Sequence, residues 1–282
     1  MNKFKTLLIK DWYISKKSLL MPFWITAGFY ILIVLAVAVG YFRGDIPFDE
    51  LGMEGEMAIP AIIYAINIGL FSLPGFIILI FTITLTQSAL NEDVRKNCEL
   101  FHRSQPVSVW WRSLSKYTIG IGGNWAVLLV IAIFNYIVIN TILAFFGQTN
   151  FYASLSGFAQ GFLSFAKIGL LLGSLTYFCS AVFKDKAFFQ GVAILLGINF
   201  LFLIVNVLMG WKLPLPLKYI IDLFSFTSFS NFDGDPTMIN LPEMINGMWN
   251  KLIFNWKTVL QVGVSGALFA AATLIYDHKE VK

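Results

Sequence analysis

Residues 91–117 read NEDVRKNCELFHRSQPVSVWWRSLSKY and form a charged island between two strongly apolar runs. The run before the island covers 58–90, and the run after it covers 118–146. Each run is longer than the roughly 20 apolar residues that a bilayer-spanning helix needs. The island is therefore predicted to be a compact polar element held at a membrane surface between two spans.

The composition extends this interpretation to the whole chain. Hydrophobic residues make up 57% of the 282 residues and charged residues only 13%, whereas soluble domains carry about 25% charged residues. Four further runs satisfy or approach the length of a span: 19–42, 157–183, 187–211 and 258–276. We therefore predict an all-α integral membrane protein with six transmembrane helices. It forms one transmembrane domain over 1–282, with no room for a soluble catalytic domain.

Basic residues predict the orientation, because short cytoplasmic loops retain Lys and Arg. The tail before the first run is rich in lysine and has Asp11 as its one acid: Lys3, Lys5, Lys10, Lys16 and Lys17. The segment after that run carries Arg43 and five acids: Asp45, Asp49, Glu50, Glu54 and Glu56. This asymmetry predicts a cytoplasmic N-terminus, and six spans return the C-terminus to the same side of the inner or plasma membrane. The net charge of +4 is thus assigned to membrane anchoring and not to nucleic-acid binding.

The ends of the first run leave two alternatives open. Phe4, Leu7, Leu8 and Trp12 recur at helical spacing, which predicts an interfacial amphipathic helix over residues 1–18 under the inner leaflet. A merely basic anchoring tail is the alternative. A cleaved signal peptide is disfavoured, because the apolar core is longer than the roughly 7 to 15 apolar residues of such a peptide.

Cys98 and Cys179 fall at predicted cytoplasmic helix ends, so no structural disulfide is expected.

The loop over 212–257 is predicted to lie outside and to contain helices before the last span. Its later part has apolar residues at helical spacing behind Pro242 and Glu243: Leu241, Met244, Ile245, Met248, Leu252 and Ile253. An earlier piece over 217–226 is apolar enough to lie in the outer interface. Both are predicted to be helices that dip into or lie on the outer leaflet.

Several residues inside the runs have a structural and a functional interpretation. The second run would be about 48 Å long as one helix, so a kink is expected near Pro74, either as a hinge or as static packing. Lys167 is predicted to snorkel toward the outer leaflet, with a wet cavity as the alternative. Five asparagines are interpreted as interhelical hydrogen-bonding residues in preference to substrate contacts: Asn124, Asn135, Asn140, Asn199 and Asn206. Four glycines at spacings of four or eight predict a surface for close helix packing: Gly157, Gly161, Gly169 and Gly173.

Within the island, Val94, Cys98 and Phe101 fall on one helical face and charged residues occupy the others. Pro106 biases the preceding residue away from helix. The pattern predicts a short cytoplasmic helix, a turn, and an amphipathic lead-in to the third span over 91–117. Such a helix can insert into a cleft of a soluble ATPase, and a solvated loop is the alternative. The candidate interface residues are Glu92, Asp93, Arg95, Lys96, Glu99, Phe101, Arg103 and Pro106.

The island resembles the loop between spans two and three in permease subunits of ABC-2 type exporters. That loop has an acidic start, a second Glu, a turn similar to Pro106-Val107-Ser108, and a basic residue such as Lys116 opening the next span. The acidic positions here are Glu92, Asp93 and Glu99. The family often has Gly-Thr before the second Glu, where this chain has Asn97-Cys98. The layout of helices resembles the family over nearly the whole chain.

The resemblance implies a permease that forms an export path as a dimer, with a second copy or a similar permease, and binds cytoplasmic ATP-binding cassette subunits. No phosphate-loop motif GxxxxGK[ST] occurs in the sequence, so ATP and Mg²⁺ are expected in the partner subunit and not in this chain. The cargo is not readable from the apolar spans. An ion-coupled secondary transporter and a non-transporting membrane anchor or regulatory protein are the alternatives.

No catalytic or metal site is predicted. Gly263-Val264-Ser265-Gly266 matches the GxSG of rhomboid-like proteases, but a serine nucleophile needs a base within hydrogen-bond reach. His102 and His278 lie outside the predicted spans and have no metal-ligand spacing. Close helix packing is therefore the preferred interpretation of this motif.

Overall fold

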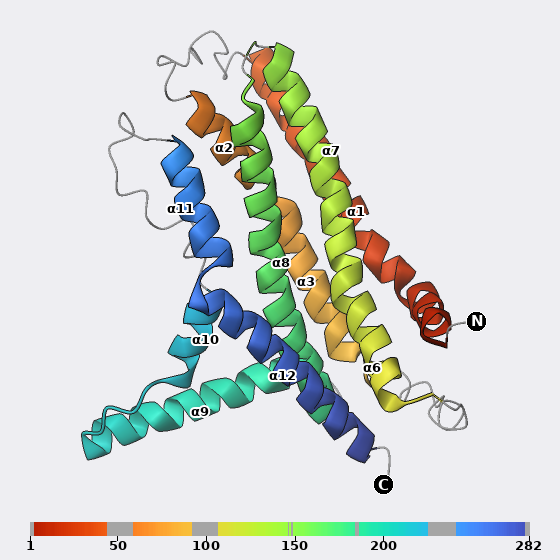
Figure 1. Cartoon of the computed structure of the whole chain (residues 1–282), viewed down its shortest axis with the longest axis vertical. Helices are drawn as coiled ribbons and strands as arrows, with labels where there is room; N and C mark the ends of the chain where they lie inside the picture. Colours follow the sequence, from red (N-terminus) through yellow and green to blue (C-terminus); the bar gives the residue numbers. More distant parts are fainter. Residues whose placement is uncertain are drawn as a thin grey trace.

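The computed structural model describes residues 3–43, 59–91, 107–145, 147, 149–183, 186–224 and 241–279. Every regular element in these residues is a helix, and they contain no strand. Figure 1 shows long helices gathered around α8 (Phe151–Val182), while α9 (Ala187–Met209) leaves the bundle sideways from the end of α8. The predicted all-helical fold is confirmed for this part of the chain.

Five helical segments among the described residues are long and apolar enough to cross a membrane. They are Ile59–Ser88, Val109–Phe145, Phe151–Val182, Ala187–Met209 and Pro242–His278. These segments overlap the second to sixth apolar runs along nearly their whole length. The first run lies in α1 (Lys3–Arg43), which is not one of the five, so the six-span topology stays a prediction.

Three of the five segments are composed of helices in series. The first joins α2 (Ile59–Gly69) to α3 (Ser72–Ser88). The second joins α6 (Val109–Tyr117), the π-helix η2 (Thr118–Gly122) and α7 (Gly123–Phe145). The last joins α11 (Leu241–Ile253) to α12 (Trp256–Lys279). The short helix α10 (Pro216–Phe224) follows α9. The fourth run begins earlier than predicted, because the side chain of Asn150 accepts a hydrogen bond from Ala153 N (2.9 Å) and caps α8.

One continuous helix, α1, covers both the predicted interfacial helix and the first apolar run. No helix-breaking residue stands between its two parts, and Pro22 removes only one backbone donor inside it. Leu7, Leu19 and Thr26 are buried along its length, and α1 contacts α3 and α6. The interfacial position of the N-terminal part stays a prediction, and the helix continues from it into the first apolar run.

The predicted bend in the second run is present, a few residues before Pro74. Helix α2 ends at Gly69 and α3 begins at Ser72, whose Oγ donates to the Gly69 carbonyl (2.7 Å). Phe71 lies between the helices, is fully buried, and packs its ring 5.4 Å from that of Phe158 in α8. The missing N–H of Pro74 and the buried Phe71 together favour this bend.

The glycines of α8 form a packing surface, as predicted. A Cβ on Gly157 would lie 2.6 Å from the backbone oxygen of Tyr64, and one on Gly173 would lie 2.7 Å from the side chain of Ile121. A Cβ on Gly161 would meet the ring of Phe71 at 2.5 Å. Side chains larger than hydrogen would therefore separate α8 from α2, α3 and η2.

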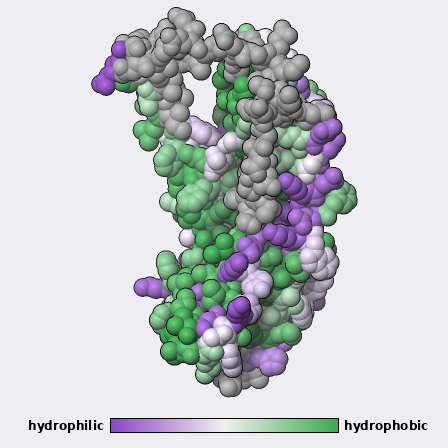
Figure 2. Space-filling model, turned by 90° about the vertical axis from the view of Figure 1, so that its left-hand side faces the viewer, coloured by the Kyte–Doolittle hydropathy of each residue, from purple (hydrophilic) through white to green (hydrophobic). Residues whose placement is uncertain are grey.

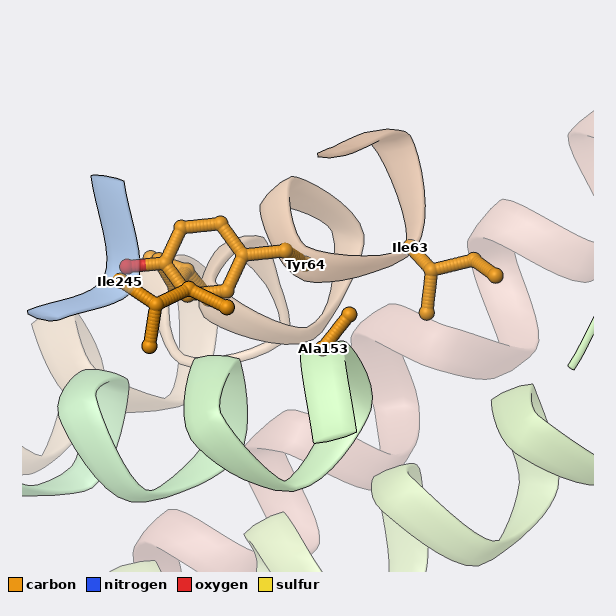
Figure 3. Close-up of a cluster of buried hydrophobic side chains, with 5 residues drawn as sticks. Ile63, Tyr64, Ala153 and Ile245 are labelled. Atoms are coloured by element: carbon orange, nitrogen blue, oxygen red, sulfur yellow. The ribbon is translucent and has the colours of Figure 1, made fainter. Parts of the chain in front are cut away.

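Helix α11 packs by its apolar face against α2 and α8. Figure 3 shows the ring of Tyr64 beside Ile245, with Ile63 and Ala153 on the neighbouring turns of α2 and α8. Gln160 of α8 accepts a hydrogen bond from the Tyr64 hydroxyl and donates to the Ile245 carbonyl (3.1 Å). The apolar residues that the sequence places at helical spacing behind Pro242 and Glu243 thus lie in α11.

The opposite side of α11 is polar. Its exposed residues include Glu243, Asn246, Asn250 and Lys251. Figure 2 views the molecule from the left-hand side of Figure 1. Between the grey atoms, this side is mainly hydrophobic and is crossed by a band of hydrophilic residues. A position in the outer leaflet stays a prediction for both short helices.

Two of the five asparagines that were predicted to hydrogen-bond between helices do so in the structure. Asn135 of α7 donates to the hydroxyl of Tyr30 in α1 (2.6 Å). Asn140 of α7 donates to Asn67 Oδ1 in α2 (3.0 Å) and accepts from Ser154 Oγ in α8 (2.6 Å). Amide groups in an apolar bundle thus find partners on neighbouring helices.

The asparagines of α9 have a different role. Asn206 exchanges hydrogen bonds with both backbone groups of Leu213 (2.9 and 2.8 Å), and Asn199 Oδ1 accepts from Leu217 N (3.3 Å). These bonds hold the segment after α9 and the start of α10 against α9, and Gln261 of α12 donates to the Leu223 carbonyl of α10. Ala187 is the one buried residue of α9.

Candidate functional site

The predicted interface residues of the island lie outside the described residues. This applies to Glu92, Asp93, Arg95, Lys96, Glu99, Phe101, Arg103 and Pro106. The structure describes the two ends of the island, Asn91 on one side and Val107 onward on the other. The candidate site is therefore built from the residues that fasten these two ends.

The first end is fastened to the last turn of α8. Asn91 Nδ2 donates to the carbonyl oxygens of Ser180 (2.9 Å) and Phe183 (2.7 Å). The last carbonyls of a helix have no intrahelical partner, so this amide satisfies groups that would otherwise need water. The start of the island and the end of α8 are consequently held together.

The second end is fastened through α6. Ser113 is fully buried, and its Oγ lies 2.9 Å from Tyr177 Oη of α8 and 2.6 Å from Thr273 Oγ1 of α12. The Tyr177 hydroxyl also donates to the Ser113 carbonyl (3.0 Å). Three helices thus meet in one buried network of hydroxyl groups.

Aromatic rings surround this network. The ring of Tyr117 lies 5.4 Å from that of Tyr177, edge to face, and 4.7 Å from that of Phe269 in α12. The Tyr117 hydroxyl lies 2.7 Å from Ser174 Oγ in α8. Such aromatic pairs contribute about 0.5 to 1.5 kcal/mol each beyond the burial of their surface, so they stabilise the contact between α6, α8 and α12.

A direct bond joins the two ends of the island. Lys116 Nζ, on the last turn of α6, donates to the carbonyl of Ala89 just after α3 (2.8 Å). We call the set of Ala89, Asn91, Ser113, Lys116, Tyr117, Tyr177, Phe269 and Thr273 the island base. It connects α3, α6, α8 and α12.

Helix α1 also contacts this region, through a residue that sequence reasoning missed. Ser115 Oγ donates to Asp11 Oδ2 (2.5 Å), and Asp11 is only 7% exposed. The ring of Phe4 lies 5.1 Å from that of Trp111. A single acid in a lysine-rich segment, one helical turn after Leu7, was the available signal.

The π-helix η2 was not predicted either. Its sequence TIGIG contains two glycines, and a Cβ on Gly120 would lie 3.1 Å from Thr86 Cγ2 in α3. The insertion of one extra residue per turn lets α6 and α7 present different faces to α3 and α8. Such insertions are frequent at functional sites.

Lys167 bonds to two groups at the start of the last candidate span, and its predicted direction toward the outer leaflet stays a prediction. Its Nζ donates to the carbonyl of Leu252 (3.0 Å) and to Thr258 Oγ1 (2.7 Å). These atoms lie on either side of the break between α11 and α12. Carbonyls at a helix C-terminus attract cations, which explains the bond from Lys167 to the Leu252 carbonyl at the end of α11.

Among the described residues, no side chains are arranged as a metal site. The described residues contain no group of three His, Cys, Asp or Glu residues that could hold a metal ion. Ser265, the serine of the protease-like motif, is buried, and its Oγ has no hydrogen-bond partner among the described residues. Cys179 is a free thiol.

The comparisons with known proteins add no relative. No model of a known protein family matches the chain, and no curated protein matches it at a significant level.

Proposed function

We propose that the chain is the membrane-spanning subunit of an ABC-2 type ATP-binding cassette exporter, driven by a separate ATPase subunit. The island base is the observation that supports this proposal most. A force applied to 92–106 would reach α3 and α8 through Asn91 and Lys116, and α6 and α12 through Ser113. A merely solvated loop has no need of such fastening at both ends.

The charged residues of the island supply the docking chemistry in this proposal. Carboxylates at Glu92, Asp93 and Glu99 pair with basic groups of the ATPase, and Phe101 enters an apolar cleft. ATP and Mg²⁺ belong to the partner subunit. Two copies of this chain, or this chain and a similar permease, form the translocation path.

One observation favours the alternative of an ion-coupled transporter. Lys167 is an ionisable residue inside a candidate span, beside a helix break of the kind that lines ion sites in secondary transporters. Its ammonium, however, is already bonded to Leu252 and Thr258, which is a structural use of the charge. The ATPase-driven proposal is therefore preferred.

The test is copurification of a tagged chain from its native membrane, followed by ATPase measurements. The proposal expects an associated ATP-binding subunit, and no hydrolysis by the chain alone. Glu99→Lys should weaken this association by tenfold or more, because breaking one member of an interfacial charge pair costs about 2 to 5 kcal/mol. The matched control is Glu243→Lys, an exposed acid of α11, which should leave the association unchanged.

A second variant tests the island base itself. Tyr177→Phe removes the hydroxyl that bonds Ser113 and leaves the ring in place, so the ATPase should still bind while cargo-stimulated hydrolysis falls. Wild-type assembly and stimulation in both Glu99→Lys and Tyr177→Phe would contradict the proposal. An ATPase that never copurifies, with transport that follows an ion gradient, would favour the alternative.

A further inference from the structure

The N-terminal half of α1 buries one side of the helix and exposes the other. Leu7 is buried, and the ring of Phe4 lies 5.1 Å from that of Trp111 in α6. Two of the apolar residues that predicted an interfacial helix therefore contact the protein itself. The side of α1 that can meet a membrane here is the opposite one.

This opposite side combines cationic, aromatic and aliphatic side chains. All of them are exposed, and at 100° per residue all of them lie on the side of α1 that faces away from Leu7. We call this surface the lysine–aromatic stripe, and its members are Lys5, Ile9, Trp12, Tyr13, Lys16 and Lys17.

The lysines of the stripe have N–H donors to offer. Lys10, outside the stripe, lies 3.9 Å from Asp11, but none of the three stripe lysines forms an ion pair with a described residue. Lys16 Nζ lies 5.0 Å from the centroid of the Tyr13 ring, and this cation–π contact leaves its three N–H donors available. Three cations on one side of a helix, without an acidic neighbour, attract anions.

The stripe continues directly into the apolar surface of α1. Residues 18–42 contain no charged side chain. Their length of about 37 Å at 1.5 Å per residue is enough to cross a hydrocarbon core of roughly 30 Å. Leu20 and Trp24 are exposed within this length. Lys16 and Lys17 are the last cations before it, which is the level of the lipid phosphates for a helix that enters a bilayer.

The apolar members of the stripe favour a lipid over an acidic protein as the partner. Ile9, Trp12 and Tyr13 are 44%, 41% and 64% exposed between the lysines. Aromatic rings in such positions lie among lipid headgroups, and lysine stems lie along them while the ammonium groups reach the phosphates. Figure 1 shows this end of α1 in the half of the bundle that holds both chain ends.

We propose that the lysine–aromatic stripe binds anionic phospholipids of the leaflet nearest the N-terminus, with phosphatidylglycerol as the representative. Its lysines donate to the phosphate oxygens, its aromatic rings lie between the headgroups, and the acyl chains follow the apolar surface of α1. Lipid then holds the outer side of α1, while the inner side packs on α6. This binding does not depend on an ATPase partner.

The test is a titration of the purified full chain, in neutral detergent, with phosphatidylglycerol or phosphatidylcholine of identical acyl chains. Bound lipid is measured by native mass spectrometry. Each lysine near an anionic lipid contributes about fivefold to binding, so the wild type should prefer phosphatidylglycerol at least tenfold. The triple variant Lys5→Gln, Lys16→Gln, Lys17→Gln should lose this preference. Arginine at the same three positions should keep it.

A control variant removes the same charge elsewhere. Lys212→Gln, Lys218→Gln and Lys251→Gln together change three exposed lysines outside the stripe and should leave the preference unchanged. Raising the salt concentration from about 0.05 M to about 0.5 M should reduce the wild-type preference severalfold, because salt screens exposed charges. The stripe variant should not respond to salt in this way.

Two results would overturn the proposal: an equal loss in the stripe and control variants, or a wild-type preference in the stripe variant. An excess of free glycerol phosphate should not compete with the lipid. If it competes as well as phosphatidylglycerol does, the stripe binds soluble phosphate esters and the lipid assignment is wrong. The assignment is also wrong if the stripe variant keeps the lipid preference but loses a copurifying acidic protein.

Discussion

Gly157 places the backbone of α8 in direct contact with the backbone of α2. The carbonyl of Tyr64 occupies the space that any Cβ at Gly157 would need. In an apolar solvent, where hydrophobic burial does not drive helices together, such close approach supplies much of the packing energy. Gly161 has the same role against the ring of Phe71, whose position determines the bend between α2 and α3.

Gly157→Ala should therefore destabilise the protein. The new methyl group forces α2 away from α8, and overpacking of this kind costs about 1 to 3 kcal/mol. The measurement is the free energy of unfolding in mixed micelles, followed by tryptophan fluorescence. Gly266→Ala is the matched control, because a Cβ there meets nothing within 4 Å and alanine favours helix. Equal destabilisation in both variants would contradict the assigned contact.

Some of these residue roles could be predicted from the sequence, and others could not. The spacing of four between Gly157 and Gly161 is a local signal, so the packing surface was predictable. Asp11 has no local signal of comparable strength, because its partner Ser115 is distant in sequence and the helix wheel of 1–18 indicated an interfacial position. The hydroxyl network of Ser113 was missed for the same reason. Its members are a serine, a tyrosine and a threonine on three helices that are distant in sequence, so no local pattern connects them.

At the scale of the element, the break between α11 and α12 is stabilised by a residue of another helix, α8. Lys167 of α8 bonds the Leu252 carbonyl before the break and Thr258 after it, and Thr258 Oγ1 also donates to Leu252 (2.8 Å). One side chain thus satisfies a helix end and fixes the angle at which the polypeptide continues. In Figure 1, α11 runs beside α8 and α12 crosses it.

Lys167→Met should loosen α11 while α12 stays packed. The loss of these interhelical hydrogen bonds should lower the free energy of unfolding by about 1 to 2 kcal/mol. Spin labels on cysteines at the exposed positions Leu155 and Asn250, with native cysteines replaced by serine, should show a broader distance distribution. Lys212→Met changes an exposed lysine and should have neither effect. A narrow, unchanged distribution in Lys167→Met would show that the break holds without the lysine.

Element boundaries were predictable where a residue type enforces them. Pro74 indicated the bend of the second run, and Pro242 with Glu243 indicated the start of α11. The continuity of α1 and the π-helix at 118–122 were not, because the first depends on contacts with α3 and α6 and the second on the fit of Gly120 against Thr86. The island itself was found by its charge, yet its base consists of uncharged groups apart from Lys116.

At the scale of the whole molecule, α1 and α9 decide how the bundle is placed in a membrane. Helix α9 is apolar along its length and has one buried residue, so lipid or another protein chain must cover it. Helix α1 is 41 residues long, about 60 Å at 1.5 Å per residue, and its lysine-rich start packs beside the island base. A helix of that length is about twice as long as the hydrocarbon core of roughly 30 Å is thick, so part of it must extend beyond the core or the helix must tilt strongly.

Cysteine labelling tests this placement. With Cys98 and Cys179 replaced by serine, single cysteines at Asp49 and Gly234 should react with an impermeant thiol reagent from outside. Cysteines at Lys5, Lys96 and Asp277 should react only after permeabilisation. The expected difference between Lys5 and Asp49 follows from the five lysines before the first run and the five acids after it, because translocation retains basic residues. Reaction of both from the same side would mean that α1 does not cross, which leaves five spans and termini on opposite sides.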